Sequence, residues 1–190
     1  FWLWRFLGRL HPIAVHFPVS LLLFAAVLEL FTLKNFDTPS RTGIRLLLAA
    51  GTIAAIISAT MGLLLVKEGG YELKASNIHQ WTGIATAFFS AITWLVSNSI
   101  HKKDKRNLIK LYRVFLFTSA IGVAIAGHFG ASLTHGKDYI TATIPWSDSY
   151  DKSTNSNFDI TTFKNDTTPL TKQQSIELNV KVRAIFAHNC

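Results

Sequence analysis

Four long runs of apolar residues fill the first two thirds of the chain and predict four membrane-spanning helices. The runs cover residues 13–33, 44–66, 79–100 and 111–134. Each is close to the length of about twenty residues that an α-helix needs to cross a hydrocarbon layer about 30 Å thick. The second run is rich in glycine, alanine and serine, which let helices approach closely in lipid. The pattern therefore predicts an all-α, four-helix transmembrane bundle.

The pattern changes after residue 141. Residues 142–171 are mostly serine, threonine, asparagine, aspartate and lysine, and such a segment cannot bury enough apolar surface to fold alone. Thr171 and Gln174 then have the spacing of a helix capping box, and apolar residues follow at helical spacing. We expect a transmembrane domain over 1–141, a polar, disordered or extended linker over 142–171, and the first helix of another domain over 172–190. No internal repeat is recognised beyond the four apolar runs.

Composition and charge support a membrane protein. Of the 190 residues, 49% are hydrophobic and only 16% are charged, which is too apolar for an ordinary soluble domain. A net charge of +8 could indicate nucleic-acid binding, but lysine and arginine gather at the ends of the apolar runs, as membrane topology requires. We therefore expect no nucleic-acid partner.

The basic residues also predict an orientation. The connection at 101–110 is the most basic of the chain, whereas that at 67–77 balances its lysines with glutamates. By the positive-inside rule the first and third connections face the cytoplasm. Both termini then lie on the periplasmic side of a bacterial inner membrane. No initiator methionine or signal-peptide cleavage site is recognised, so both ends are expected to be cut from a longer gene product.

Five of the seven histidines fall at the predicted outer ends of three different helices. They are His11 and His16 in the first helix, His79 in the third, and His128 and His135 in the fourth. Ionisable residues at membrane depth are costly and usually face a bundle interior, so a shared ligand is expected. No cysteine or carboxylate lies at the same depth, which disfavours a soft-metal or hard-cation site. Haem held by axial imidazoles fits better.

Helical spacing suggests roles for these histidines. His11 and His16 are five residues apart, about 140° around a helix, so they cannot both point at one ring. His16 lies deeper and at the depth of His128, and we predict these two as an axial pair. His11 could cap the helix or contact a propionate. For His79 and His135, a second axial pair and a role as proton or propionate partners both stay open.

Other residues could complete a haem site. Gly83, Gly127 and Gly130 lie near the histidines, where small residues let a helix pass a flat ring. Arg5 and Arg9 lie in the predicted outer headgroup zone and could neutralise propionates. Cys190 follows an amphipathic segment and could be the first residue of a C-x-x-C-H motif that attaches a c-type haem. A free cysteine is the alternative, and no disulfide can form within the chain because Cys190 is its single cysteine.

Three stretches carry a resemblance to a known family: LGRLHPIAVHFPVSLLLFA, IHQWTGI and GHFGASLTHGKDYIT. They resemble the signature stretches of the four-helix membrane domain that precedes planctomycete-type cytochrome c domains and also occurs in Bacteroidetes. The similarity covers residues 7–141. It implies that the five histidines named above fall on the family's histidine positions, that a cytochrome c module follows from Cys190, and that the membrane part has a redox role.

The expected function is membrane-bound electron transfer through one or two b-type haems. Such a protein would relay electrons between the membrane, with quinol as a candidate donor, and a tethered periplasmic cytochrome c. It would be a subunit working with other respiratory proteins rather than a complete enzyme. Two alternatives stay open: a transporter that uses the histidines to carry protons or a metal, and a passive anchor for a periplasmic module.

Overall fold

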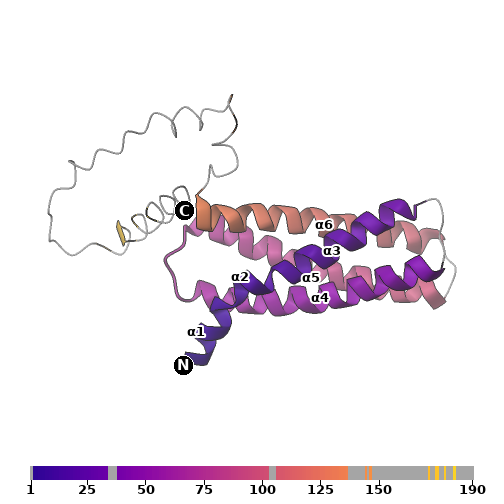
Figure 1. Ribbon diagram of the computed structural model, residues 1–190, viewed down its shortest axis with the longest axis horizontal. Coiled ribbons are helices and arrows are strands. Elements are labelled where there is room, and N and C mark those ends of the chain that lie inside the picture. Colours follow the sequence, from indigo (N-terminus) through magenta and orange to yellow (C-terminus); the bar gives the residue numbers. More distant parts are fainter. Residues whose placement is uncertain are drawn as a thin grey trace.

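The described part of the chain is a bundle of long, nearly parallel and antiparallel helices (Figure 1). The computed structural model describes residues 2–33, 38–102 and 106–136, together with positions 144, 146, 171, 174, 175, 178 and 182. The helices are α1 (Trp2–Arg9), α2 (His11–Ala14), α3 (His16–Phe31), α4 (Thr38–Val66), α5 (Leu73–Lys102) and α6 (Arg106–His135). Four helical segments are long and apolar enough to cross a membrane: Trp2–Phe31, Ser40–Val66, Leu73–Ile100 and Asn107–His135. The predicted all-α bundle with four spans is confirmed.

The first span consists of three short helices, and its prolines explain the interruptions. Pro12 lies in the first turn of α2 and Pro18 in the first turn of α3, where a helix best tolerates proline. Neither proline has a backbone N–H, so neither can donate to the carbonyl four residues earlier. The chain nevertheless keeps its direction, because Leu10 and Val15, at the two junctions, have right-handed helical backbone angles.

The helices extend beyond the apolar runs that predicted them. α4 begins at Thr38, inside the expected connection, and α5 begins at Leu73 rather than at His79. α6 begins at Arg106, so most of the basic stretch 101–110 is helical. Apolar runs mark only the hydrocarbon-crossing part of a span. Polar residues outside that layer can continue the helical hydrogen bonding, and this is why the predicted boundaries were too short.

The bundle has two ends with different chemistry. At the first end lie α1 and α2, the connection between α4 and α5, and the end of α6 (Figure 1). We call it the histidine end, because His11 and His79 lie in the helices that begin there. At the opposite end α3 finishes near α4, and α5 finishes near α6. We call it the Glu29 end, after the buried carboxylate in the last turns of α3.

The four spans pack in a closed ring. The first span contacts α4 and α6, and α5 contacts the same two helices, so the first span and α5 occupy opposite corners. Small residues allow close packing, as the second apolar run suggested. A Cβ at Gly51 would lie 2.9 Å from Leu22 Cδ2, and one at Gly8 would lie 2.9 Å from the backbone nitrogen of Leu65.

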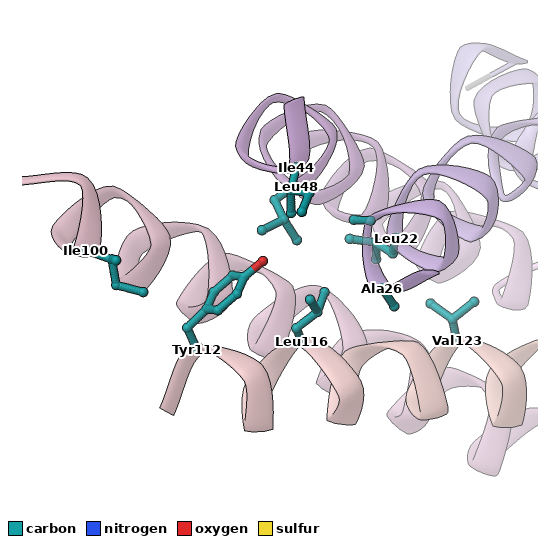
Figure 2. Close-up of a cluster of buried hydrophobic side chains, with 9 residues drawn as sticks. Leu22, Ala26, Ile44, Leu48, Ile100, Tyr112, Leu116 and Val123 are labelled. Carbon is teal, nitrogen blue, oxygen red and sulfur yellow. The ribbon is translucent and has the colours of Figure 1, made fainter. Parts of the chain in front are cut away.

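The buried core connects all four spans. Figure 2 shows its side chains, including Leu22 and Ala26 of α3, Ile44 and Leu48 of α4, Ile100 of α5, and Tyr112, Leu116 and Val123 of α6. Tyr112 is the largest of these fully buried side chains, and its hydroxyl points away from its own helix. Small hydroxyl residues, among them Ser90, Thr93 and Ser119, are buried beside this apolar cluster, and Tyr112 brings a further polar atom toward the Glu29 end.

The capping box at Thr171 is confirmed. The backbone N–H of Thr171 donates to Gln174 Oε1 at 2.9 Å, and the backbone N–H of Gln174 donates to Thr171 Oγ1 at 3.3 Å. Gln174, Ser175, Leu178 and Val182 are helical. Apart from positions 144 and 146, the remainder of the expected linker and last helix, including Cys190, lies outside the described residues.

Candidate functional site

The five expected histidines all lie in helical segments at the histidine end, but their side chains have different surroundings. His16, His128 and His135 are exposed on the surface of the bundle. His11 and His79 are half-buried between helices. Of the two histidines in the first span, the structure therefore directs His11, rather than His16, into the bundle.

His11 and His79 are in contact with each other. Their ring centroids lie 5.8 Å apart, and their ring planes are inclined by 74°. His11 comes from α2 in the first span and His79 from the second turn of α5, so the pair joins opposite corners of the bundle. Two imidazoles that meet in this way can share one ligand between them.

Both rings are fixed by the same kind of hydrogen bond. His11 Nδ1 lies 2.9 Å from the backbone oxygen of Ser58, and His79 Nδ1 lies 2.8 Å from that of Ala126. A carbonyl oxygen only accepts hydrogen bonds, so each Nδ1 must carry the proton. In a neutral imidazole Nε2 then has a lone pair, and this arrangement is typical of metal-binding histidines.

Two glycines make room for the rings. A Cβ at Gly62 would lie 2.9 Å from His11 Cε1, and one at Gly130 would lie 3.0 Å from His79 Cε1. Contacts this short are closer than van der Waals packing allows, so alanine at either position would displace the ring. Gly130 was among the expected site residues, whereas Gly62 was not. The other two, Gly83 and Gly127, have no neighbouring atom within 4 Å of the Cβ position, so open space lies beside each.

The structure does not bring His16 and His128 together. His16 Nδ1 lies 3.3 Å from the backbone oxygen of Ile13, within its own span, and the His128 ring contacts the adjacent Phe129 ring at 5.4 Å. The ring that contacts His79 is that of His11. The axial pairings expected from depth alone therefore differ from the contact that the bundle makes. Depth along a helix does not specify which way a side chain points around it.

The expected arginines lie at the same end of the bundle. Arg9 forms an exposed ion pair with Glu68, with Nη2 3.1 Å from Oε2. Arg5 borders an open groove of about 650 Å³ that is also lined by Trp4, Leu64, Lys67 and Glu68. The groove lies between α1 and the end of α4. Arg9 already has a carboxylate partner, so Arg5 is the better placed of the two to meet a further anionic group.

The described residues contain no group of three or more histidine, cysteine, aspartate or glutamate side chains that could hold a metal ion. The histidine end therefore offers two converging imidazoles and no third protein ligand in the part of the chain that the structure describes. Structural zinc takes four protein ligands, and catalytic zinc takes three. Two ligands suffice when a macrocycle supplies the rest of the coordination.

The Glu29 end contains a buried ionic cluster that the sequence analysis did not predict. Glu29 is 0% exposed. Arg41 Nη1 lies 2.6 Å from Glu29 Oε2, Arg113 Nε lies 2.8 Å from Oε1, and the Tyr112 hydroxyl donates to Oε2 at 3.0 Å. The Arg41 guanidinium also lies 5.7 Å from the centroid of the Tyr112 ring. One carboxylate thus holds residues of α4 and α6 against α3.

A signal for this cluster was present in the sequence. A glutamate inside an apolar run requires a partner, because an isolated charge in the membrane is costly. Arg41 and Arg113 are among several cations, including Arg45 and Lys110, at the same predicted end of the bundle as Glu29. The choice among them could not be made from spacing, and the structure uses Arg41 and Arg113.

Comparison with known proteins places the chain in a membrane family. Residues 9–141 match the family model described as a predicted membrane protein (DUF2231). This range contains α2 to α6 and all five histidines of the histidine end. No curated protein and no solved structure matches the chain.

Proposed function

The chain belongs to the DUF2231 family of predicted membrane proteins, and from this premise we propose that its four-helix domain binds haem b at the histidine end and transfers electrons. The residues that would hold the haem in this proposal are His11 and His79. We prefer this pair to His16 and His128, the pair predicted from the sequence, because the side chains of His16 and His128 are exposed whereas His11 and His79 contact each other.

The observation that carries the proposal is the matched geometry of His11 and His79. Each ring donates from Nδ1 to a carbonyl of the neighbouring helix, which orients the ring and leaves Nε2 to bind iron. The rings come from opposite corners of the bundle and lie 5.8 Å apart, so both could contribute to holding one haem.

The number of ligands favours haem over zinc. A zinc site built by the protein takes three or four protein ligands, and the described residues bring no third ligand to the pair. Gly83 lies one turn after His79 and has open space at its Cβ position, which would let a flat macrocycle approach α5 there, whereas Gly127 is exposed on the surface of the bundle. His11, His79 and Gly83 therefore fit haem.

Haem in this position would supply reversible one-electron chemistry. The contribution of the chain is to hold two imidazoles in a fixed tautomer, to keep apolar helices around them, and to limit water at the site. Hydrogen bonding to the ligand imidazoles and burial are the means by which a protein adjusts the potential of such a centre. Ser58 and Ala126 supply those hydrogen bonds here through their backbone carbonyls.

The partners in the proposal rest on the sequence. The positive-inside rule places the histidine end on the periplasmic side, where a cytochrome c module following the segment at Thr171 would also lie. A tether of about thirty residues gives such a module a search radius of about 30 Å. The membrane-side donor would be quinol, and the protein would act as an electron-transfer subunit.

The test is a reduced-minus-oxidised absorption spectrum of the purified full chain. We expect a b-type α band in the wild type, and its loss in His11→Ala and in His79→Ala. His16→Ala and His128→Ala are the matched controls, because they remove exposed histidines from the same end, and we expect both to retain the band. Added imidazole should restore part of the band in His11→Ala by filling the missing ligand position.

Two outcomes would overturn the proposal. One is a purified protein that binds no haem in cells or after addition of hemin. The other is a band that survives in His11→Ala and His79→Ala. If instead the band were lost in His16→Ala and His128→Ala, the ligand pair first predicted from depth would be correct and the bundle would have to rearrange on binding.

A further inference from the structure

The contacts of His11 and His79 repeat each other along the chain. Each histidine bonds the backbone carbonyl of a residue 47 positions later, Ser58 for His11 and Ala126 for His79. Four residues after each carbonyl comes the glycine on which the ring rests, Gly62 and Gly130. The first set is thus His11, Ser58 and Gly62, and the second is His79, Ala126 and Gly130. Each residue of the second set lies 68 positions after its counterpart in the first.

The same displacement relates buried positions throughout the two halves. In each of these pairs of residues 68 positions apart, both members are buried: Pro18 and Thr86, Leu22 and Ser90, Ala25 and Thr93, Ile44 and Tyr112, Leu48 and Leu116, Gly51 and Ser119, and Ala55 and Val123. The coincidence runs along both spans of each half. It was hidden in the sequence, because the residue types at most of these positions differ. Other buried residues, such as Ala26, Glu29 and Thr52, have partly buried counterparts.

A few residue types are also retained. Arg45 corresponds to Arg113, Ile53 to Ile121, and Leu65 to Leu133. The other three histidines of this end have no histidine counterpart, since His16 corresponds to Ile84, His128 to Thr60, and His135 to Lys67. Among the histidines of the described bundle, the repeat thus relates His11 and His79 alone.

We propose that the domain is a duplicated helical hairpin whose two copies each contribute an equivalent half of one ligand site. The first copy consists of the first span and α4, and the second consists of α5 and α6. A pseudo-two-fold axis parallel to the spans would exchange the copies, as parallel repeats do in other membrane proteins. The ring order of the spans agrees, because exchanging the first span with α5 and α4 with α6 preserves every neighbour.

The axis explains why the two imidazoles touch. Equivalent residues from two copies can contact each other only where the axis passes between them. Each half then supplies an imidazole, the carbonyl that sets its tautomer, and a glycine that acts as a positioning residue for the ring. The ligand class that fits is a metal centre that takes one imidazole nitrogen from each side. Only its identification as haem rests on the proposed function.

The copies differ at the Glu29 end. The counterpart of Glu29 is Ser97, whose hydroxyl bonds the backbone oxygen of Trp94, and the counterpart of Arg41 is Ile109. The ionic cluster thus belongs to one copy's α3 and breaks the symmetry, while the histidine end preserves it.

The test is ¹⁵N-histidine NMR of the full chain in detergent, without added ligand. The wild-type spectrum should contain neutral, Nδ1-protonated signals from both His11 and His79, each assigned by its loss in His11→Gln or His79→Gln. His16 Nδ1 also lies near a backbone carbonyl, and any signal from it is assigned by its loss in His16→Gln. Gly62→Ala should shift the His11 signal and Gly130→Ala the His79 signal. Gly43→Ala is the matched control, because its Cβ meets no atom within 4 Å, and it should shift neither.

A titration with hemin completes the test. Gly62→Ala and Gly130→Ala should weaken hemin binding to a similar extent, by roughly ten-fold each, with Gly43→Ala unchanged. If hemin does not bind but the paired NMR signals are present and respond as described, the duplicated half-sites stand and the haem proposal fails. A Nδ1–H tautomer in only one of the two histidines, in the wild type, would overturn the duplication of the site whatever the fate of the variants. Unequal responses of the two glycine variants would also overturn it.

Discussion

Glu29 shows how a single charged residue can be tolerated inside an apolar helix. Its carboxylate is fully buried and accepts bonds from Arg41, Arg113 and Tyr112. The contacts satisfy both oxygens, which is what a buried charge requires. The cost of removing the carboxylate should therefore be large, because two guanidinium groups would lose their common partner.

We predict that Glu29→Gln lowers the free energy of unfolding by about 3 to 5 kcal/mol, the usual cost of breaking a buried ion pair from one side. Glu68→Gln is the matched control. It removes the carboxylate of the exposed Arg9 pair, where the expected loss is about 1 kcal/mol or less. Denaturant unfolding of the two purified variants, followed by circular dichroism, measures the difference. Equal losses would show that the cluster at the Glu29 end contributes nothing beyond a surface pair.

Among the elements, α1 depends on one glycine for its place against the bundle. Gly8 is its buried residue, and the backbone of Leu65 in α4 leaves no room for a Cβ there. Trp2, Trp4 and Phe6 on the same helix are exposed, as is common for aromatic residues at a membrane interface. The helix thus presents one small residue to α4 and its aromatic residues to the surroundings.

We predict that Gly8→Ala separates α1 from α4, because the contacted atoms belong to the backbone and cannot rotate away. The expected loss of stability is about 1 to 3 kcal/mol, typical of overpacking. Tryptophan fluorescence should change if α1 moves, since Trp2 and Trp4 lie on it. Gly43→Ala, at a position with open space, should change neither the fluorescence nor the thermal midpoint. An unchanged midpoint in Gly8→Ala would contradict the close approach of α1 and α4.

For the whole molecule, the four spans imply that both connections at the Glu29 end lie on one side of the membrane. The histidine end lies on the other side, with α1 and the connection between α4 and α5. The basic residues around 101–110 predict that the Glu29 end faces the cytoplasm.

This orientation predicts a labelling pattern in intact cells. In a Cys190→Ser background, Lys67→Cys at the histidine end should react with a membrane-impermeant maleimide added from outside. Asn107→Cys at the Glu29 end should react only after the membrane is permeabilised. Both positions are exposed, so accessibility to solvent is matched. The reverse pattern would place the histidines on the cytoplasmic side and would exclude a periplasmic partner at that end.

The sequence by itself determined the all-α class, the four spans, and the gathering of five histidines at one end. These follow from the length of apolar runs and from position along a helix, which are one-dimensional properties. Even the capping box at Thr171 could be predicted, because its two residues are only three apart. The ends of the helices were placed too far inward, because polar residues continue a helix beyond the hydrocarbon layer.

Only the tertiary structure decided which side chains meet. The contacts between His11 and His79 and between Glu29 and Arg113 join residues far apart in sequence, and they depend on how each span is rotated about its own axis. Weakly amphipathic, largely apolar spans contain little information about that rotation, so depth favoured His16 while packing selected His11. The duplication was hidden for a related reason. Burial is shared by the two halves, but the side chains that satisfy it have diverged.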